Sequence, residues 1–64
     1  SQVQQIKEKS LQQRLDNLMS DYEALAKQLD YTTNVVDRNA IERQMEVMAE
    51  ELDKVASDLD ALGR

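Results

Sequence analysis

The stretch LDYTTNVVDRNAI, residues 29–41, decides the fold because the regular spacing of apolar residues breaks down there. On both sides of it, apolar residues recur at every third or fourth position. Proline and glycine do not cause the break, since the chain has no proline and its only glycine is Gly63. Either the chain reverses direction here or one helix runs straight through, and the two alternatives give different molecules.

Two heptad seams flank the break. The first runs from Leu11 to Leu29 and the second from Ile41 to Leu62, both with alternating steps of four and three residues. This spacing is typical of coiled-coil helices, and the intervening residues are good helix formers. We therefore predict an all-α fold with a hairpin core of these residues: Leu11, Leu15, Leu18, Tyr22, Leu25, Leu29, Ile41, Met45, Met48, Leu52, Val55 and Leu59.

The phases of the two seams favour a reversal. The first seam continues to Thr32, and the equivalent position of the second seam is Ile41, nine residues on. At about 100° per residue, nine residues turn a helix by ~900°, which is half a turn out of phase. A straight helix would carry its seams on opposite faces, where each needs a separate partner. Folding back lets each seam cover the other, so we predict an antiparallel two-helix hairpin.

The residues of the break are suited to a turn. Thr32, Thr33 and Asn34 have short polar side chains that compete for backbone hydrogen bonds. Asn34 is the preferred cap of the second helix, and Asp37 is the rival. We predict a helix over about residues 3–31, a turn over 32–34 and a helix over 35–62, in a single domain spanning 1–64 that has been cut from a larger protein.

Pairing the seams about residue 33 places five apolar layers opposite one another, from Leu25 facing Ile41 to Leu11 facing Val55. This register also predicts weak surface ion pairs. The expected pairs are Arg14 with Asp53, Glu23 with Arg43, and Lys7 and Lys9 with Asp58 and Asp60.

The N-terminal segment is harder to interpret. Val3 and Ile6 are out of phase with Leu11, and Ser10 could cap a helix that starts at Leu11. Because Leu59 and Leu62 need apolar cover, we expect the helix to start near residue 3 with Val3 and Ile6 covering them.

Composition excludes several functions. The net charge is −5, without a basic stripe, which disfavours binding to nucleic acid. We expect no membrane segment, because no apolar run is long enough to span a bilayer, and a cytoplasmic location is the default. A chain of 64 residues without Cys or His lacks disulfides and the usual zinc ligands. Association with a partner is the remaining source of stability.

No constellation of residues predicts catalysis, a cofactor or a metal. The acidic segment EELDKVASDLD, residues 50–60, reads as a solvated helix face and lacks the spacing of a calcium loop. Asp30 and Asp37 lie near the predicted tip, where acidic residues of some transcript-cleavage factors hold a metal, but here capping is the favoured role. We predict a protein that is not an enzyme.

Further apolar residues lie beside the seams, so the apolar surface is wider than one helix contact uses. The small residues among them would let another helix approach closely. We predict a second interface, for a homo-oligomer or a related hairpin, with a four-helix bundle as the expected assembly. Its candidate residues are Met19, Ala26, Val47, Ala49 and Ala56.

Two segments, DYEALAKQLDYT (21–32) and RNAIERQMEVMAEEL (38–52), resemble a known family. They are similar to the effector-associated, Death-like helical-hairpin adaptor domains of bacterial signalling proteins, which accompany STAND-type NTPases and caspase-like or TIR effectors. The resemblance rests on leucine spacing together with Tyr22, Tyr31, Arg38 and Arg43. It implies a non-catalytic adaptor that binds copies of itself or a sibling hairpin and so couples a sensor NTPase to an effector.

Two other functions remain as alternatives. One is a structural coiled-coil segment that serves as a spacer or an oligomerisation stalk. The other is an accessory factor whose acidic tip, with Asp30 and Asp37, reaches into the active site of another machine.

Overall fold

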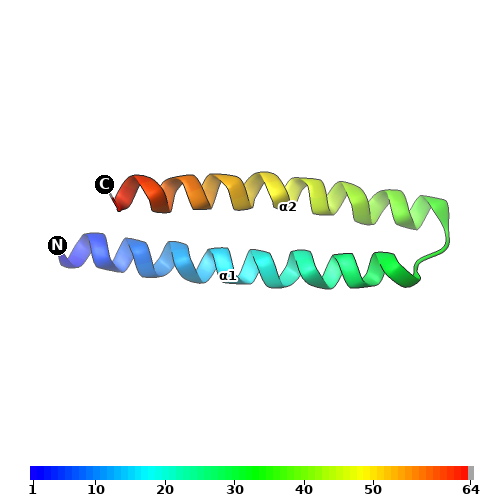
Figure 1. Ribbon diagram of the computed structural model, residues 1–64, viewed down its shortest axis with the longest axis horizontal. Helices are drawn as coiled ribbons and strands as arrows, with labels where there is room; N and C mark the ends of the chain where they lie inside the picture. Colours follow the sequence, from blue (N-terminus) through cyan, green and yellow to red (C-terminus); the bar gives the residue numbers. More distant parts are fainter. Residues whose placement is uncertain (64) are drawn as a thin grey trace.

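The computed structural model describes residues 1–63, which form two long antiparallel helices (Figure 1). Helix α1 spans Gln2–Tyr31 and helix α2 spans Val35–Leu62, with residues 32–34 as the turn between them. The described residues contain no strand, so the predicted all-α hairpin is confirmed. The molecule measures 50 × 14 × 12 Å. A single straight helix of this length would extend ~96 Å at 1.5 Å per residue.

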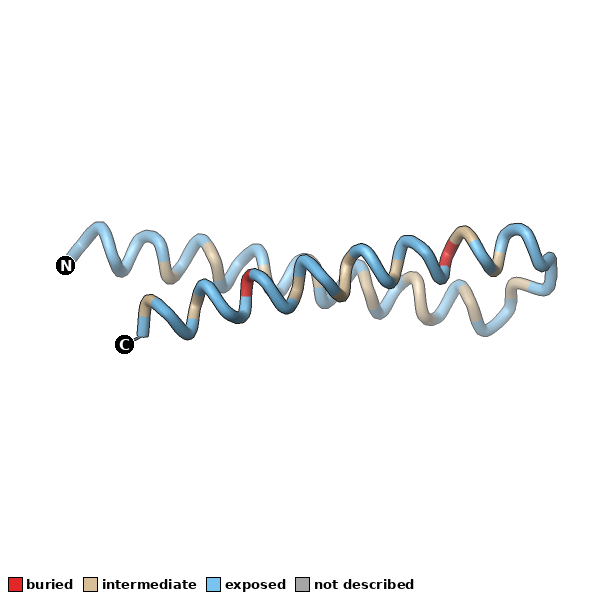
Figure 2. Tube along the Cα trace, turned by 90° about the horizontal axis from the view of Figure 1, so that it is seen from above, coloured by how far each residue is buried: buried red, intermediate tan, exposed pale blue. Residues whose placement is uncertain are grey.

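The core lies along the line where the two helices meet. Ile41 and Val55 are the buried hydrophobic residues of the described chain, with 6% and 3% of their surfaces exposed. The other ten residues of the expected hairpin core are half-buried, and they recur along the two helices in Figure 2. Two helices can cover each seam from one side only, which explains why so few side chains are fully enclosed.

Cross-helix contacts define how the helices are aligned. At the ends of the chain, the side-chain amide of Gln4 donates a hydrogen bond to the carbonyl of Leu62. Nearer the middle, the guanidinium of Arg14 lies 3.7 Å from the carboxylate of Glu51. The prediction that Arg14 pairs with Asp53 was therefore wrong. Asp53 directly follows the seam residue Leu52, so it is turned about 100° to the other side of the helix.

The other expected ion pairs do not form either. Lys7 and Asp58 line the same groove at the open end, but neither Lys7 nor Lys9 forms an ion pair in the part of the chain that the structure describes, so their predicted pairs with Asp58 and Asp60 were wrong. Within residues 1–63, Glu23 and Arg43 do not form an ion pair, so that prediction was also wrong. The two groups sit on exposed surfaces, where water competes with the attraction between the charges.

The turn is closed by caps on both helices. The side-chain oxygen of Asn34 accepts a hydrogen bond from the backbone N–H of Asp37 at 3.1 Å, which confirms Asn34 as the cap of α2. The hydroxyl of Thr32 donates to the carbonyl of Gln28 at 2.6 Å. Arg38 reaches back from α2 and donates to the carbonyls of Leu29, at 2.9 Å, and Thr32, at 2.8 Å. These bonds satisfy carbonyls that a helix end otherwise leaves unpaired.

At the N-terminus, α1 begins at Gln2 and Ser1 is its cap, with the Ser1 hydroxyl accepting from the N–H of Gln4 at 3.2 Å. The alternative start at Leu11 was wrong, because the helix runs through Ser10 without interruption. Val3 and Ile6 are 62% and 68% exposed, so the expectation that they cover the end of α2 was wrong too. The five-residue step from Ile6 to Leu11 turns Ile6 about 140° away from the seam.

Removing the Arg38 guanidinium should loosen the turn. We predict that Arg38→Met lowers the free energy of unfolding by about 1 kcal/mol, because two charge-assisted hydrogen bonds to helix-end carbonyls are lost. Arg43→Met, an exposed change on the same helix, should stay within about 0.5 kcal/mol of the original chain. Urea unfolding followed by circular dichroism at one chain concentration measures both. Equal losses in the two variants would contradict the role assigned to Arg38.

Candidate protein-interaction surfaces

The described residues present most of their charged and apolar side chains on open surfaces. Among residues 1–63, no group of three or more potential ligand side chains could hold a metal ion. The acidic stretch 50–60 and the tip carboxylates therefore do not converge on a common point. No helix in the described part of the chain is long and apolar enough to cross a membrane.

Large apolar side chains are exposed in three regions. One is the open end of the hairpin, where the N-terminus of α1 lies beside the C-terminus of α2 (Figure 1). The second is the tip around the turn, and the third is the sides of the helices. The exposed fractions are Val3 62% and Ile6 68% at the open end, Tyr31 76%, Val35 68% and Val36 72% at the tip, and Met19 47% and Val47 56% on the sides.

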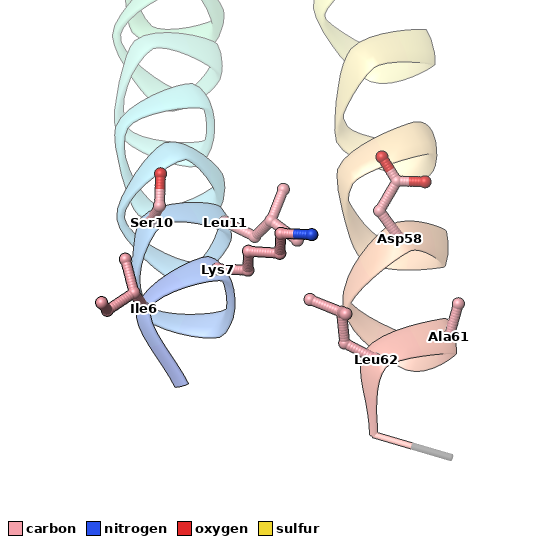
Figure 3. Close-up of a pocket in the computed structure, with 7 residues that line it drawn as sticks. All are labelled: Ile6, Lys7, Ser10, Leu11, Asp58, Ala61 and Leu62. Atoms are coloured by element: carbon pink, nitrogen blue, oxygen red, sulfur yellow. The ribbon is translucent and has the colours of Figure 1, made fainter. Parts of the chain in front are cut away.

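A groove lies between the helices at the open end (Figure 3). The side chains of Leu11 and Leu62 point into the space between α1 and α2, and Lys7 extends from α1 towards α2. Its lining consists of Ile6, Lys7, Ser10, Leu11, Asp58, Ala61 and Leu62. The groove thus combines apolar side chains with one positive and one negative group.

The groove exists because the seam of α1 becomes polar at its N-terminal end. The heptad phase set by Leu15 and Leu11 continues to Glu8 and Gln4, and neither side chain can seal the contact as leucine would. Glu8 is half-buried, and Gln4 bonds to the Leu62 carbonyl instead of packing on its side chain. Sequence reasoning missed this groove, although extending the seam phase by one heptad would have revealed the polar positions.

The predicted partner interface divides between two sides of the hairpin. One surface groove is lined by Tyr22, Leu29, Met45 and Ala49, together with Glu42 and Glu46. Ala26 falls on the same side, because it lies four residues after Tyr22 and three before Leu29. Met19 and Ala56 are seven residues from Ala26 and Ala49, so they extend the two rows. Ala26 and Ala49 are half-buried, whereas Ala56 is exposed.

Val47 lies elsewhere, two residues from both Met45 and Ala49 and thus about 200° around the helix from either. The groove on the opposite side is lined by charged residues of both signs around Leu11 and Val55. We call this side the mixed flank, and its charged residues are Arg14, Glu51, Lys54 and Asp58.

We call the side with Ala26 and Ala49 the acidic flank. Its outer edges carry carboxylates, because in both helices an acidic residue directly follows each seam residue on this side. These seam residues are Leu15, Tyr22, Leu29, Met45, Leu52 and Leu59. A residue one position after a seam residue is turned by about 100° around the helix from it. Ala26 and Ala49 lie four positions after Tyr22 and Met45, which turns them by about 40° in the same sense. The carboxylates therefore lie just outside the small residues. They are Asp16, Glu23 and Asp30 in α1 and Glu46, Asp53 and Asp60 in α2, all exposed, with Glu42 inside the groove.

Comparison with known protein families matches this hairpin to one of them. The family model for effector-associated domain 9 matches residues 1–62. The chain belongs to this family. The resemblance to effector-associated domains is thereby confirmed, and the effector-associated domain occupies both helices and the turn. No curated protein and no solved structure matches the chain significantly.

Membership in the effector-associated domain 9 family implies a signalling-associated adaptor role. Such a domain is a small helical unit that is not known as a catalyst, and its role implies interactions with other proteins. The effector-associated domain described here presents its charged and apolar residues on open surfaces, which is the arrangement that contact with another protein requires.

The acidic flank should cost the effector-associated domain stability. Glu42, Glu46 and Glu50 follow one another at four-residue intervals on α2, a spacing at which like charges repel. We predict that Glu46→Lys raises the free energy of unfolding by about 0.3–0.5 kcal/mol, since it replaces two repulsive pairs by attractive ones and turns one attractive pair, with Arg43 three residues before it, repulsive. Glu46→Gln should give about half of that gain.

Thermal and urea unfolding at low ionic strength would measure these changes, and added salt should reduce the differences among the three chains. A loss of stability in the lysine variant would show that Glu46 has a stabilising partner and is not part of a repulsive row.

Proposed function

We propose that this hairpin is a non-catalytic adaptor that joins proteins by helical-hairpin association, pairing with a second copy of itself and so coupling a sensor NTPase to an effector. Family membership supports the adaptor role. The resemblance of residues 11–59 to hairpins that accompany STAND-type NTPases and caspase-like or TIR effectors supports the two kinds of protein that it would connect.

The observation that carries this proposal is the shortage of buried apolar surface. Ile41 and Val55 are the hydrophobic residues buried in the described chain, whereas seven large apolar side chains are between 47% and 76% exposed. A chain this short draws only ~3–5 kcal/mol from its own core. Packing against a further pair of helices would bury more apolar surface and stabilise both partners, as in four-helix bundles.

The open-end groove is suited to a second copy. In a two-fold interface, the same surface of both copies is in contact, and each residue meets a different residue of the other copy. A surface that carries a positive and a negative group can therefore pair each group with the opposite charge on the second copy. Lys7 and Asp58 provide the two signs, and Ile6, Leu11 and Leu62 provide apolar contact. A stable interface takes about 800 Å² from each partner. The described chain exposes 5054 Å², so such an interface is a modest part of its surface.

Sedimentation equilibrium of the isolated chain tests this proposal. We predict a dimer at about 50 μM, an affinity in the range of weak signalling contacts. Ile6→Glu should give a helical monomer, because it places a charge in the apolar part of the groove without disturbing the hairpin core. Val36→Glu is the matched control: it is 72% exposed at the tip, against 68% for Ile6, and should leave the dimer intact.

Circular dichroism must show equal helicity in all three chains for the comparison to hold. A monomeric original chain at this concentration would overturn homotypic association. A dimer that survives Ile6→Glu but dissociates with Val36→Glu would move the interface from the open end to the tip.

A further inference from the structure

We propose that the acidic flank docks an amphipathic helix whose apolar stripe is bordered by Lys or Arg, contributed by a different protein and not by a second copy of this chain. The proposal rests on the adaptor function and adds to it the chemistry of the second partner.

The floor of this flank can receive a helix. Its groove is lined by Tyr22, Leu29, Met45 and Ala49, and Met19 beside it is 47% exposed. Alanine at 26 and 49 permits close approach, because helix axes pack 8–10 Å apart according to the side chains at their contact. Methionine adapts its shape to different apolar partners. A partner helix would therefore find a continuous apolar strip along both helices.

The rim of this flank determines the charge of the partner. Glu42 and Glu46 line the groove itself, and exposed carboxylates border it on both helices. Asp16 accepts a hydrogen bond from the amide of Gln12, at 3.1 Å, which leaves its negative charge uncompensated. Among residues 1–63, Lys9 is the single basic residue in either outer row, and it lies beyond Asp16 towards the open end. A helix with basic edges would complement this rim along its length.

A second copy does not suit the acidic flank. Bringing two such flanks together would set carboxylate rows against each other, and like charges brought together at an interface disfavour that partner. The mixed flank, with Arg14 and Lys54 beside Glu51, could supply some opposite charge. Its ion pair between Arg14 and Glu51 already engages part of that charge. Nucleic acid and anionic lipid are excluded by the same negative rim.

The acidic flank and the open-end groove do not share lining residues. One hairpin can therefore hold a second copy at its open end and a basic helix on its side. This separation is what an adaptor needs to join two different proteins.

Fluorescence anisotropy with synthetic peptides tests the proposal on the full chain. The probe is a labelled amphipathic helix about as long as α2, with a Leu and Ala stripe bordered by Lys, and the comparison peptide has Gln in place of every Lys. We predict that the Lys peptide binds about tenfold more tightly and that salt weakens its binding more. Equal affinities for the two peptides would overturn the proposal.

Two double variants locate the binding surface. Glu46→Gln with Asp53→Asn should weaken binding of the Lys peptide about fivefold, since it removes two rim charges. Asp21→Asn with Glu51→Gln removes the same net charge from the side of the mixed flank, where Glu51 lines the groove, and should leave binding nearly unchanged. Equal weakening by both pairs would show attraction to overall charge and overturn docking at this flank.

Sedimentation equilibrium of the same samples separates this proposal from homotypic association. A dimer that persists in the Glu46→Gln, Asp53→Asn chain while peptide binding falls supports two independent surfaces. If the original chain is monomeric yet prefers the Lys peptide, the acidic flank retains its assignment and only homotypic association fails. If it is dimeric and does not bind the Lys peptide, the acidic-flank proposal alone is overturned.

Discussion

The half-turn offset between the two apolar seams is the constraint on which the rest of the molecule depends. Because the phase changes between Leu29 and Ile41, a continuous helix could not cover both seams, and the chain reverses through residues 32–34. The reversal brings Ile41 and Val55 into the contact between α1 and α2. It also fixes what remains uncovered, since two helices packed along one line leave a flank on each side. The exposed surfaces that we assign to partners are thus a direct consequence of the offset.

The sequence was sufficient to predict the helices, the reversal and the Asn34 cap, because each depends on local spacing or on a side chain bonding to its own turn. It was insufficient where a contact depends on distant residues. The prediction for Arg14 paired it with Asp53, yet the geometry of the contact brings Glu51 to it, since alignment about a midpoint ignores which side of a helix a residue occupies. The clamp from Arg38 to the carbonyls of Leu29 and Thr32 depends on the path of the turn itself. Val3 and Ile6 are exposed because their positions in the helical repeat turn them away from the contact with α2, although Leu62 at the end of α2 lacks apolar cover.

Charge distributes unevenly over this small surface, and the unevenness follows from one feature of the sequence. Acidic residues directly follow seam residues in both helices, as in Tyr22–Glu23 and Met45–Glu46, so helical rotation collects them on the same side of the hairpin. Basic residues such as Arg14 and Lys54 fall on the opposite side. The two flanks therefore differ in chemistry. The net charge of −5 indicates which partners are disfavoured but does not reveal this difference. Adaptor domains benefit from this arrangement, since two partners of different chemistry do not compete for one surface.

The acidic flank also bears on the choice between an adaptor and a passive spacer. Glu42, Glu46 and Glu50 repel one another along α2, in a hairpin with little buried surface to offset the cost. A spacer would be more stable with Lys at the middle position, and that change requires no rearrangement of the core because Glu46 is exposed. A row of like charges beside an apolar groove lowers the stability of the free hairpin and raises its discrimination among partners. That combination favours a surface used for selective binding over one that merely keeps two helices apart.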